Sequence, residues 1–233
     1  MIETISSKKL SEIFNIKLFY VITLLFAFTF FSFIVNSQNW ELRKDVNDIK
    51  VYTRFVEGSD YKEVKVEILA KSTLAGVSKI LNEVSGFPKW VYSCSKAIVL
   101  KQVSPNEGYT YSVIEAPWPV SDRDVVTHYV QTQDPVTKII TVNLVDEKNY
   151  LPTQDNKVRV ASFVACMKII PLKNGMVQII ESFHTEPGGW VPSWLSNIVI
   201  IDGPYYTFYN FKKMLALKEY NEYRTKGILE PED

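Results

Sequence analysis

The chain has 233 residues, of which 46% are hydrophobic and 22% charged, and this composition indicates a globular core rather than a disordered polymer. Lys and Arg together number 26 and so do Asp and Glu, which argues against a nucleic-acid-binding protein, since such proteins normally have a basic excess. The many aromatic residues, Trp 5, Tyr 13 and Phe 13, suit a packed core or a cavity for an apolar ligand.

The N-terminus carries a targeting signal. Three lysines precede the uncharged run 18–35, and residues 35–37 resemble a cleavage site, so the pattern predicts a secretory signal peptide over residues 1–37. The run is long for a signal core and slightly short for a span of about 20 residues, so a retained membrane anchor through 18–35 is the open alternative. In both cases we expect residues 38–233 to be exported as one domain, because the positive flank stays inside.

The exported part begins with an extended segment, 40–55, and an alternating strand, 61–69, whose apolar residues share one face. A helix follows, capped within 72–73 and ended by Gly86 and Pro88. Six further strands are predicted, separated by turn residues, at 96–103, 109–115, 124–131, 138–144, 157–170 and 176–185. Their short connections favour an antiparallel meander.

The C-terminal part has helical spacing from Pro192 to about Arg224, and Gly203-Pro204 is expected to kink or split this helix. Its apolar stripe needs a surface to pack against, and the sheet is the one available. The sequence therefore predicts an α+β fold, in which a curved antiparallel sheet wraps around a long C-terminal helix and leaves room for a cavity.

A search for catalytic or metal-binding chemistry finds no candidate. His184 lies three residues from Glu181, which places the two on opposite faces of a strand and argues against a dyad. No spacing matches a zinc site, a phosphate-binding loop or a nucleophile elbow. Cys94 and Cys166 either form one disulfide or are two small buried side chains.

The most distinctive segment is 117–126, where Trp118 stands between two prolines and Arg123-Asp124 opens a β-branched run. A structural ion pair or turn clamp is the favoured interpretation of Arg123 and Asp124, over direct contact with a ligand. Trp118 is expected to be a packed anchor.

Residues 117–124, Pro-Trp-Pro-Val-Ser-Asp-Arg-Asp, resemble the P-W-P-x-S-x-R-D signature of the START (StAR-related lipid transfer) domain. Segments 87–90, 157–160 and 186–197 match other parts of that family's pattern in the same order. The resemblance implies a helix-grip (START/Bet v 1-like) fold that holds one lipid in an internal tunnel, with a loop and the C-terminal helix as its lid. It implies neither a metal nor a cofactor.

Candidate ligand-binding side chains are apolar or phenolic and come from the strands and the last helix: Tyr111, Val113, Val125, Thr127, Tyr129, Trp194, Ile198, Tyr205, Phe208 and Phe211. Which strand face points inward stays open at this point. Tyr129 stands where some animal sterol carriers have a second Arg, so a charged pair in the tunnel is not expected. Gly188 and Gly189 are expected to supply unusual φ angles, and Trp190 and Trp194 are expected to contact either a membrane surface or the core.

These features favour a non-catalytic, monomeric lipid carrier or sensor that makes transient contact with a membrane and binds no nucleic acid. One alternative is a cyclase- or hydrolase-like enzyme of the same superfamily. The other is an envelope interaction module with a collapsed cavity, and the volume of the cavity distinguishes it from a carrier.

Overall fold

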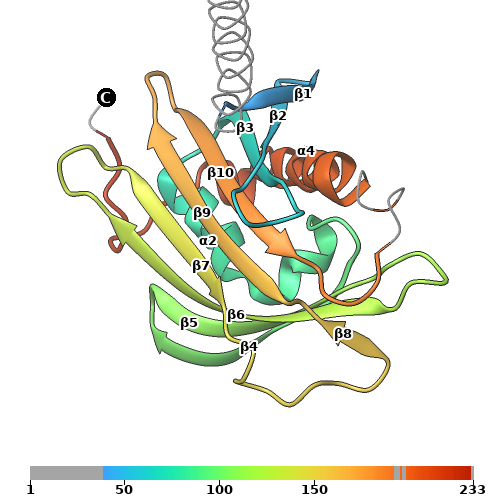
Figure 1. The fold of residues 1–233 in the computed structure, drawn as a ribbon. Helices are drawn as coiled ribbons and strands as arrows, with labels where there is room; N and C mark the ends of the chain where they lie inside the picture. Colours follow the sequence, from blue (N-terminus) through green and yellow to red (C-terminus); the bar gives the residue numbers. More distant parts are fainter. Residues whose placement is uncertain (1–38, 192–194, 196–197, 232–233) are drawn as a thin grey trace, which may run out of the picture. The chain divides into compact units, whose positions relative to one another are not determined.

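The computed structural model describes residues 39–191, 195 and 198–231, and Trp40 onward forms one compact unit. The predicted signal or anchor segment, 1–37, lies outside the described residues, and so does Trp194. Within the described part of the chain, no helix combines the length and the apolar character needed to span a membrane. The fold is a large curved sheet with a few helices on its concave side (Figure 1).

The described residues form a sheet of ten strands in the order β1-β2-β3-β10-β9-β7-β6-β5-β4, with β8 paired to β6. The strands are β1 (Glu41–Val46), β2 (Ile49–Arg54), β3 (Glu63–Lys71), β4 (Cys94–Ser104), β5 (Glu107–Ile114), β6 (Asp122–Gln133), β7 (Ile140–Asp146), β8 (Lys157–Arg159), β9 (Ser162–Pro171) and β10 (Met176–Glu186). The predicted meander is present from β4 to β10, apart from the parallel strand β8. The chain reaches the far edge through the helical segment after β3, and β10 returns to pair with β3.

Two segments predicted as single strands are divided in the structure. The segment 40–55 is a β1–β2 hairpin, because Asn47 and Asp48 adopt positive φ angles of 57° and 56° at its turn. The segment 157–170 breaks between β8 and β9, which then pair with different neighbours. Neither break contains a Gly or Pro, so the residue pattern predicted one continuous strand across each of them.

The first helical segment follows β3. Helix α2 (Leu74–Asn82) begins as predicted, with Thr73 Oγ1 accepting a hydrogen bond from the backbone N–H of Gly76. It ends before the predicted glycine and proline, which instead lie inside the 3₁₀ turn η1 (Val84–Lys89).

The C-terminal helix is shorter than the sequence suggested. A π-helical turn, η2 (Ile198–Asp202), leads into α4 (Gly203–Leu215), and a separate short helix, α5 (Lys218–Asn221), follows. Gly203-Pro204 opens α4 instead of splitting it, because a residue without an N–H fits the first helical turn.

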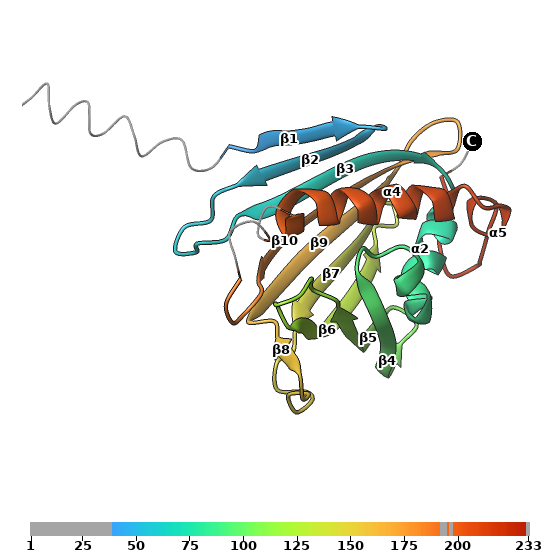
Figure 2. The ribbon, with the colours of Figure 1, turned by 90° about the vertical axis from the view of Figure 1, so that its right-hand side faces the viewer.

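Helix α4 lies on the concave side of the sheet, against β2 and β3 and next to α2 (Figure 2). Phe208, Phe211 and Leu215 are at most 1% exposed and pack among inward-facing residues of these strands and of β7, β9 and β10. This arrangement is the predicted helix-grip fold: a curved sheet that holds the C-terminal helix.

Candidate functional site

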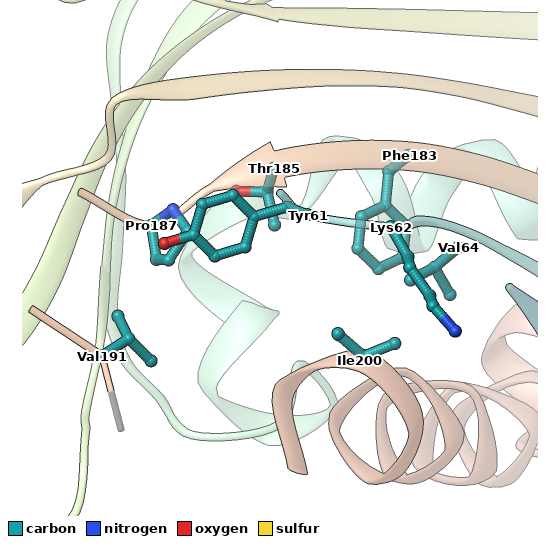
Figure 3. Close-up of a pocket in the computed structure, with 8 residues that line it drawn as sticks. All are labelled: Tyr61, Lys62, Val64, Phe183, Thr185, Pro187, Val191 and Ile200. Carbon is teal, nitrogen blue, oxygen red and sulfur yellow. The ribbon is translucent and has the colours of Figure 1, made fainter. Parts of the chain in front are cut away.

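The described pocket lies between the sheet and η2, where β3 begins and β10 ends (Figure 3). Phe183 and Ile200 approach each other across it, from β10 and η2. Its lining is almost wholly apolar and consists of Tyr61, Lys62, Val64, Phe183, Thr185, Pro187, Val191 and Ile200. The cavity volume is about 30 Å³. This is room for a water molecule or two, whereas sites for drug-sized ligands occupy roughly 300–1,000 Å³.

Arg123 ties together two loops, one of which contains the pocket residues Pro187 and Val191. Its guanidinium donates hydrogen bonds to the backbone carbonyls of Ser121, Gly188 and Trp190, at 3.2 Å for Gly188 and 3.3 Å for Trp190. Burial lowers the pKa of Arg123, and no carboxylate of the described residues forms an ion pair with it. Arg123 therefore acts as a structural clamp between the loops after β5 and β10.

Asp124 is also a structural residue, but its partner is not the neighbouring arginine. Its carboxylate accepts two hydrogen bonds from Arg159, at 2.9 Å from Nε and 3.0 Å from Nη2. Of the two expected roles, a structural ion pair or a turn clamp, Arg123 and Asp124 do not form an ion pair with each other, because consecutive strand residues point to opposite faces of the sheet. The bond from Asp124 instead fastens β8 to β6.

Gly188 and Gly189 have φ angles of 68° and 59°, which confirms the expected unusual backbone. A Cβ atom on Gly188 would lie 2.8 Å from the carbonyl oxygen of Arg159, so the loop also packs closely on β8. Trp118, by contrast, is 91% exposed, and its predicted role as a packed anchor is wrong. Trp190 on the neighbouring loop is 72% exposed, so neither indole is part of the core.

The strand register separates the predicted ligand-binding residues into two groups. Val125, Thr127 and Tyr129 lie on the inner face of β6, in the same set as Gln131, which accepts a hydrogen bond from Ser78 of α2. Tyr111 and Val113 lie on the outer face, where they pack with Val126, Leu100 and Leu151. Burial, followed by the nearby Asp124 carboxylate, raises the pKa of Tyr111, which agrees with this outer position.

The inner-face group is not part of the described pocket. Tyr129 stands in one cross-strand row with Leu144, Ala165 and Phe183, so three strand spacings, about 14 Å along the sheet, separate it from Phe183. Its hydroxyl accepts a hydrogen bond of 2.8 Å from Gln102.

The predicted ligand-binding residues of the C-terminal helix lie on the concave side of the sheet, but they are buried in the core. Tyr205, Phe208 and Phe211 all belong to the core beneath α4, with exposures of 6%, 1% and 0%. Ile198 begins η2. Contact of any of these residues with a ligand stays a prediction.

Sequence reasoning missed the polar groups of the inner face. Glu181 of β10 lies in register with Val66 and Met167, two buried core residues. Thr53 of β2 is 1% exposed, and its hydroxyl has no hydrogen-bond partner among the described residues. The signal for Glu181 was available: it is the polar member of the alternating set Val177, Ile179, Glu181, Phe183.

Other reactive side chains are dispersed. The cysteines are both free, which rules out the disulfide in this structure, and burial raises the pKa of the Cys94 thiol. His184 contacts Ser59 and the carbonyl of Tyr61 on the face opposite Glu181, as expected. The described residues contain no group of three or more His, Cys, Asp or Glu side chains able to hold a metal.

Comparison with known proteins places this architecture in a family. The START domain profile matches residues 33–218. An uncharacterized protein of Pseudomonas aeruginosa, PA1579, is 34% identical over 168 residues, which are 72% of this chain and 82% of that protein. The chain belongs to the START domain family.

Solved structures agree with this assignment. A STAR-related lipid transfer protein fragment from Xanthomonas axonopodis superposes with a TM-score of 0.71 at 33% identity, covering 76% of this chain and 99% of that one. Human StAR-related lipid transfer protein 5 superposes with a TM-score of 0.67 at 15% identity, covering 84% and 95%, and shows the shared fold.

Proposed function

We propose that this START domain is a non-catalytic lipid carrier, which takes one lipid between α4 and the inner face of the sheet and exchanges it at a membrane. The observation that carries the proposal is the apolar pocket at the junction of β3, β10 and η2. Membership of a family whose matched bacterial structure is described as a lipid transfer protein supports it. Withdrawing a 16-carbon chain from a bilayer into water costs about 13 kcal/mol, and an apolar interior offsets that cost.

Lipid uptake requires the pocket to enlarge, because about 30 Å³ cannot hold an acyl chain. The sheet side is held by strand ladders and by the buried contacts of α4, so the adjustable wall is the covering segment. Ile200 lines the pocket from η2, a single π-helical turn, and such turns often occur at functional sites. We therefore expect displacement of η2 to enlarge the space between Phe183 of β10 and Ile200 of η2.

The membrane contact is assigned to Trp118 and Trp190. Their loops meet at Arg123, and Trp190 lies in the chain between the pocket residues Pro187 and Val191. Indole side chains favour the membrane interface, and two exposed ones on loops that meet suit a docking surface.

The carrier proposal is tested by mass spectrometry of the protein under native conditions after incubation with liposomes of mixed lipid classes. We expect a complex of one lipid with one chain, and the mass identifies its class. Repeated recovery of bare protein, with no uptake from any liposome, would refute the proposal.

The docking proposal is tested by the rate of lipid transfer between vesicles. Trp118→Ala combined with Trp190→Ala is expected to slow transfer while leaving the amount of lipid bound at equilibrium unchanged. Val136→Ala is the matched control, because Val136 is 85% exposed on the turn at the other end of β6. Equal transfer rates for the double variant and the control would contradict the docking proposal.

A second candidate, an interaction module with a permanently collapsed cavity, is favoured by the small volume of the pocket. The same liposome experiment decides between the two, because a module of that kind takes up no lipid.

Export of residues 38–233 is also part of this proposal, on the evidence of the charged flank and the apolar run before them. N-terminal sequencing of the protein from fractionated cells is the test. A soluble exported chain that starts near residue 38 identifies a cleaved signal peptide, whereas an intact N-terminus in the membrane fraction identifies an anchor. Recovery of the chain from the cytoplasm would exclude both.

A further inference from the structure

Glu181 is the next inward-facing residue of β10 beyond Phe183, which lines the pocket, and Glu181 itself does not line it. It follows Phe183 and Thr185 inward along the same face of β10, so it lies about 7 Å deeper than Phe183. The register places it between Val66 of β3 and Met167 of β9, which are 0% and 4% exposed. Its carboxyl group therefore lies on the inner face of the sheet, deeper than the pocket residues Phe183 and Thr185.

The strands that flank Glu181 offer no counter-charge, and Lys62, which lines the pocket just before β3, has its amine 4.5 Å from the centroid of the Phe55 ring. On the flanking strands the inward neighbours are all apolar: Val64, Val66 and Ile68 of β3, and Ala165, Met167 and Ile169 of β9. The charged and phenolic groups of the covering segments have other partners in the structure: Asp202 pairs with Lys44, Lys212 with Asp48, the Tyr205 hydroxyl with Asn47, and Lys213 with the ring of Tyr209. Glu181 forms no side-chain hydrogen bond or ion pair with any residue that the structure describes.

Glu181 is half-buried on the inner face of β10. Burial raises the pKa of Glu181 from 4.5 to about 7, and no neighbouring charge contributes. A carboxyl drawn into an apolar face without a partner is costly to the fold, so its position next to Phe183 of the pocket calls for an explanation beyond packing.

We propose that Glu181 is the specificity-determining residue of the lipid site, where it hydrogen-bonds the hydroxyl group of an uncharged lipid alcohol whose chain extends toward the pocket. This inference rests on the proposed carrier function. A hydroxyl donates to the ionised carboxylate and accepts from the protonated acid, so it satisfies Glu181 in both states. An anionic head placed there meets like charge in an apolar setting, and a cationic head has to be buried as an ion pair at a desolvation cost.

The test compares two ligands with the same chain and different heads, 1-hexadecanol and palmitate. Each is titrated against the protein carrying a neutral naphthylamine dye in its cavity, at pH 6 and pH 8, and displacement of the dye gives its affinity. The proteins are the unchanged chain, Glu181→Gln, Glu181→Leu and, as a matched control, Glu67→Gln. Glu67 lies on the opposite face of β3 and forms an ion pair of 2.6 Å with Lys65.

We expect the unchanged protein to prefer hexadecanol over palmitate more strongly at pH 8 than at pH 6. Glu181→Leu loses hexadecanol affinity by about two- to tenfold, the effect of one hydrogen bond. Glu181→Gln keeps its affinity for hexadecanol and binds palmitate better than the unchanged protein does at pH 8. Its ligand preference depends less on pH than that of the unchanged protein, and the remaining dependence comes from the titration of palmitate itself. Glu67→Gln behaves as the unchanged protein.

Two failures are distinguishable. Equal ligand preferences and equal pH dependence in the unchanged protein and in both Glu181 variants would overturn the role of Glu181 while leaving the carrier function intact. Failure of every protein, the unchanged chain included, to bind either ligand or any liposome lipid would overturn the carrier function, and this inference with it.

Discussion

The buried ion pair between Asp124 and Arg159 provides the sharpest test of the structural assignments. The two side chains are 1% and 10% exposed, and two hydrogen bonds of 2.9 and 3.0 Å join them. Arg159 also donates to the backbone carbonyls of Lys148, Leu151 and Pro152, so it holds the segment that covers the outer face of β6. Asp124→Asn keeps the size of the side chain and removes its charge.

Removing one partner of a buried ion pair costs about 3–5 kcal/mol, because the other charge stays buried without compensation. The carbonyls around Arg159 soften this penalty, so we expect the free energy of unfolding to fall by about 3 kcal/mol. For a domain of this size, that loss lowers the melting temperature by about 6–12 °C. The measurement is urea unfolding followed by circular dichroism, with a thermal scan of the same samples.

Glu222→Gln is the matched control for this experiment. Glu222 faces Lys218 at 3.6 Å on α5, but the two side chains are 65% and 84% exposed, so the change is expected to cost at most about 0.5 kcal/mol. If Asp124→Asn costs no more than the control, Asp124 does not hold Arg159 by charge, and the clamp assigned to β6 and β8 is refuted.

Three further predictions concern stability. Glu181→Gln should raise the free energy of unfolding by about 3 kcal/mol at pH 8 and leave it unchanged at pH 4. The reason is that a carboxyl whose pKa rises from 4.5 to about 7 on folding destabilises the protein as the pH rises through that interval. Urea unfolding at both pH values measures the effect. Gly188→Ala should lower the melting temperature more than Gly58→Ala, since both have positive φ but only the first places a Cβ 2.8 Å from a carbonyl of β8. Glu230→Gln should lower the free energy of unfolding by about 0.5–1 kcal/mol in the same assay, because the Glu230 carboxylate accepts two backbone hydrogen bonds at the start of α2. If the loss is equally large in 1 M salt, the charge of the carboxylate does not contribute to it.

The positions of most strands followed from the sequence because their inward residues alternate clearly. In β3 charged and apolar residues alternate from Glu63 to Ile68, and the structure reproduces that period as half-buried and buried positions. The β1–β2 hairpin was missed because its turn consists of Asn47 and Asp48 without glycine. The parallel pairing of β8 with β6 depends on Arg159 reaching Asp124, a contact 35 residues apart that no local pattern encodes.

The candidate site was less predictable than the fold. The opposite directions of Arg123 and Asp124 follow from strand geometry and could have been foreseen. The inward-pointing face of β6 could not be predicted from the sequence, because Val125, Thr127 and Tyr129 are no more apolar than their outer neighbours. The face became clear only from the register across the sheet, which aligns Tyr129 with Phe183.

The same register explains how a small pocket and a buried acid can belong to one lipid site. The row that contains Phe183 continues through Ala165, whose short side chain fills little of the space between its neighbours, while the row above it contains Glu181. Helix α4 is fixed over β2 and β3 by Phe208 and Phe211, so the sheet beyond β10 depends on other segments for its cover. If the carrier proposal holds, we therefore expect displacement of η2 to enlarge the pocket in the direction of Glu181 without breaking the core, which would give the carboxyl a ligand hydroxyl as its partner.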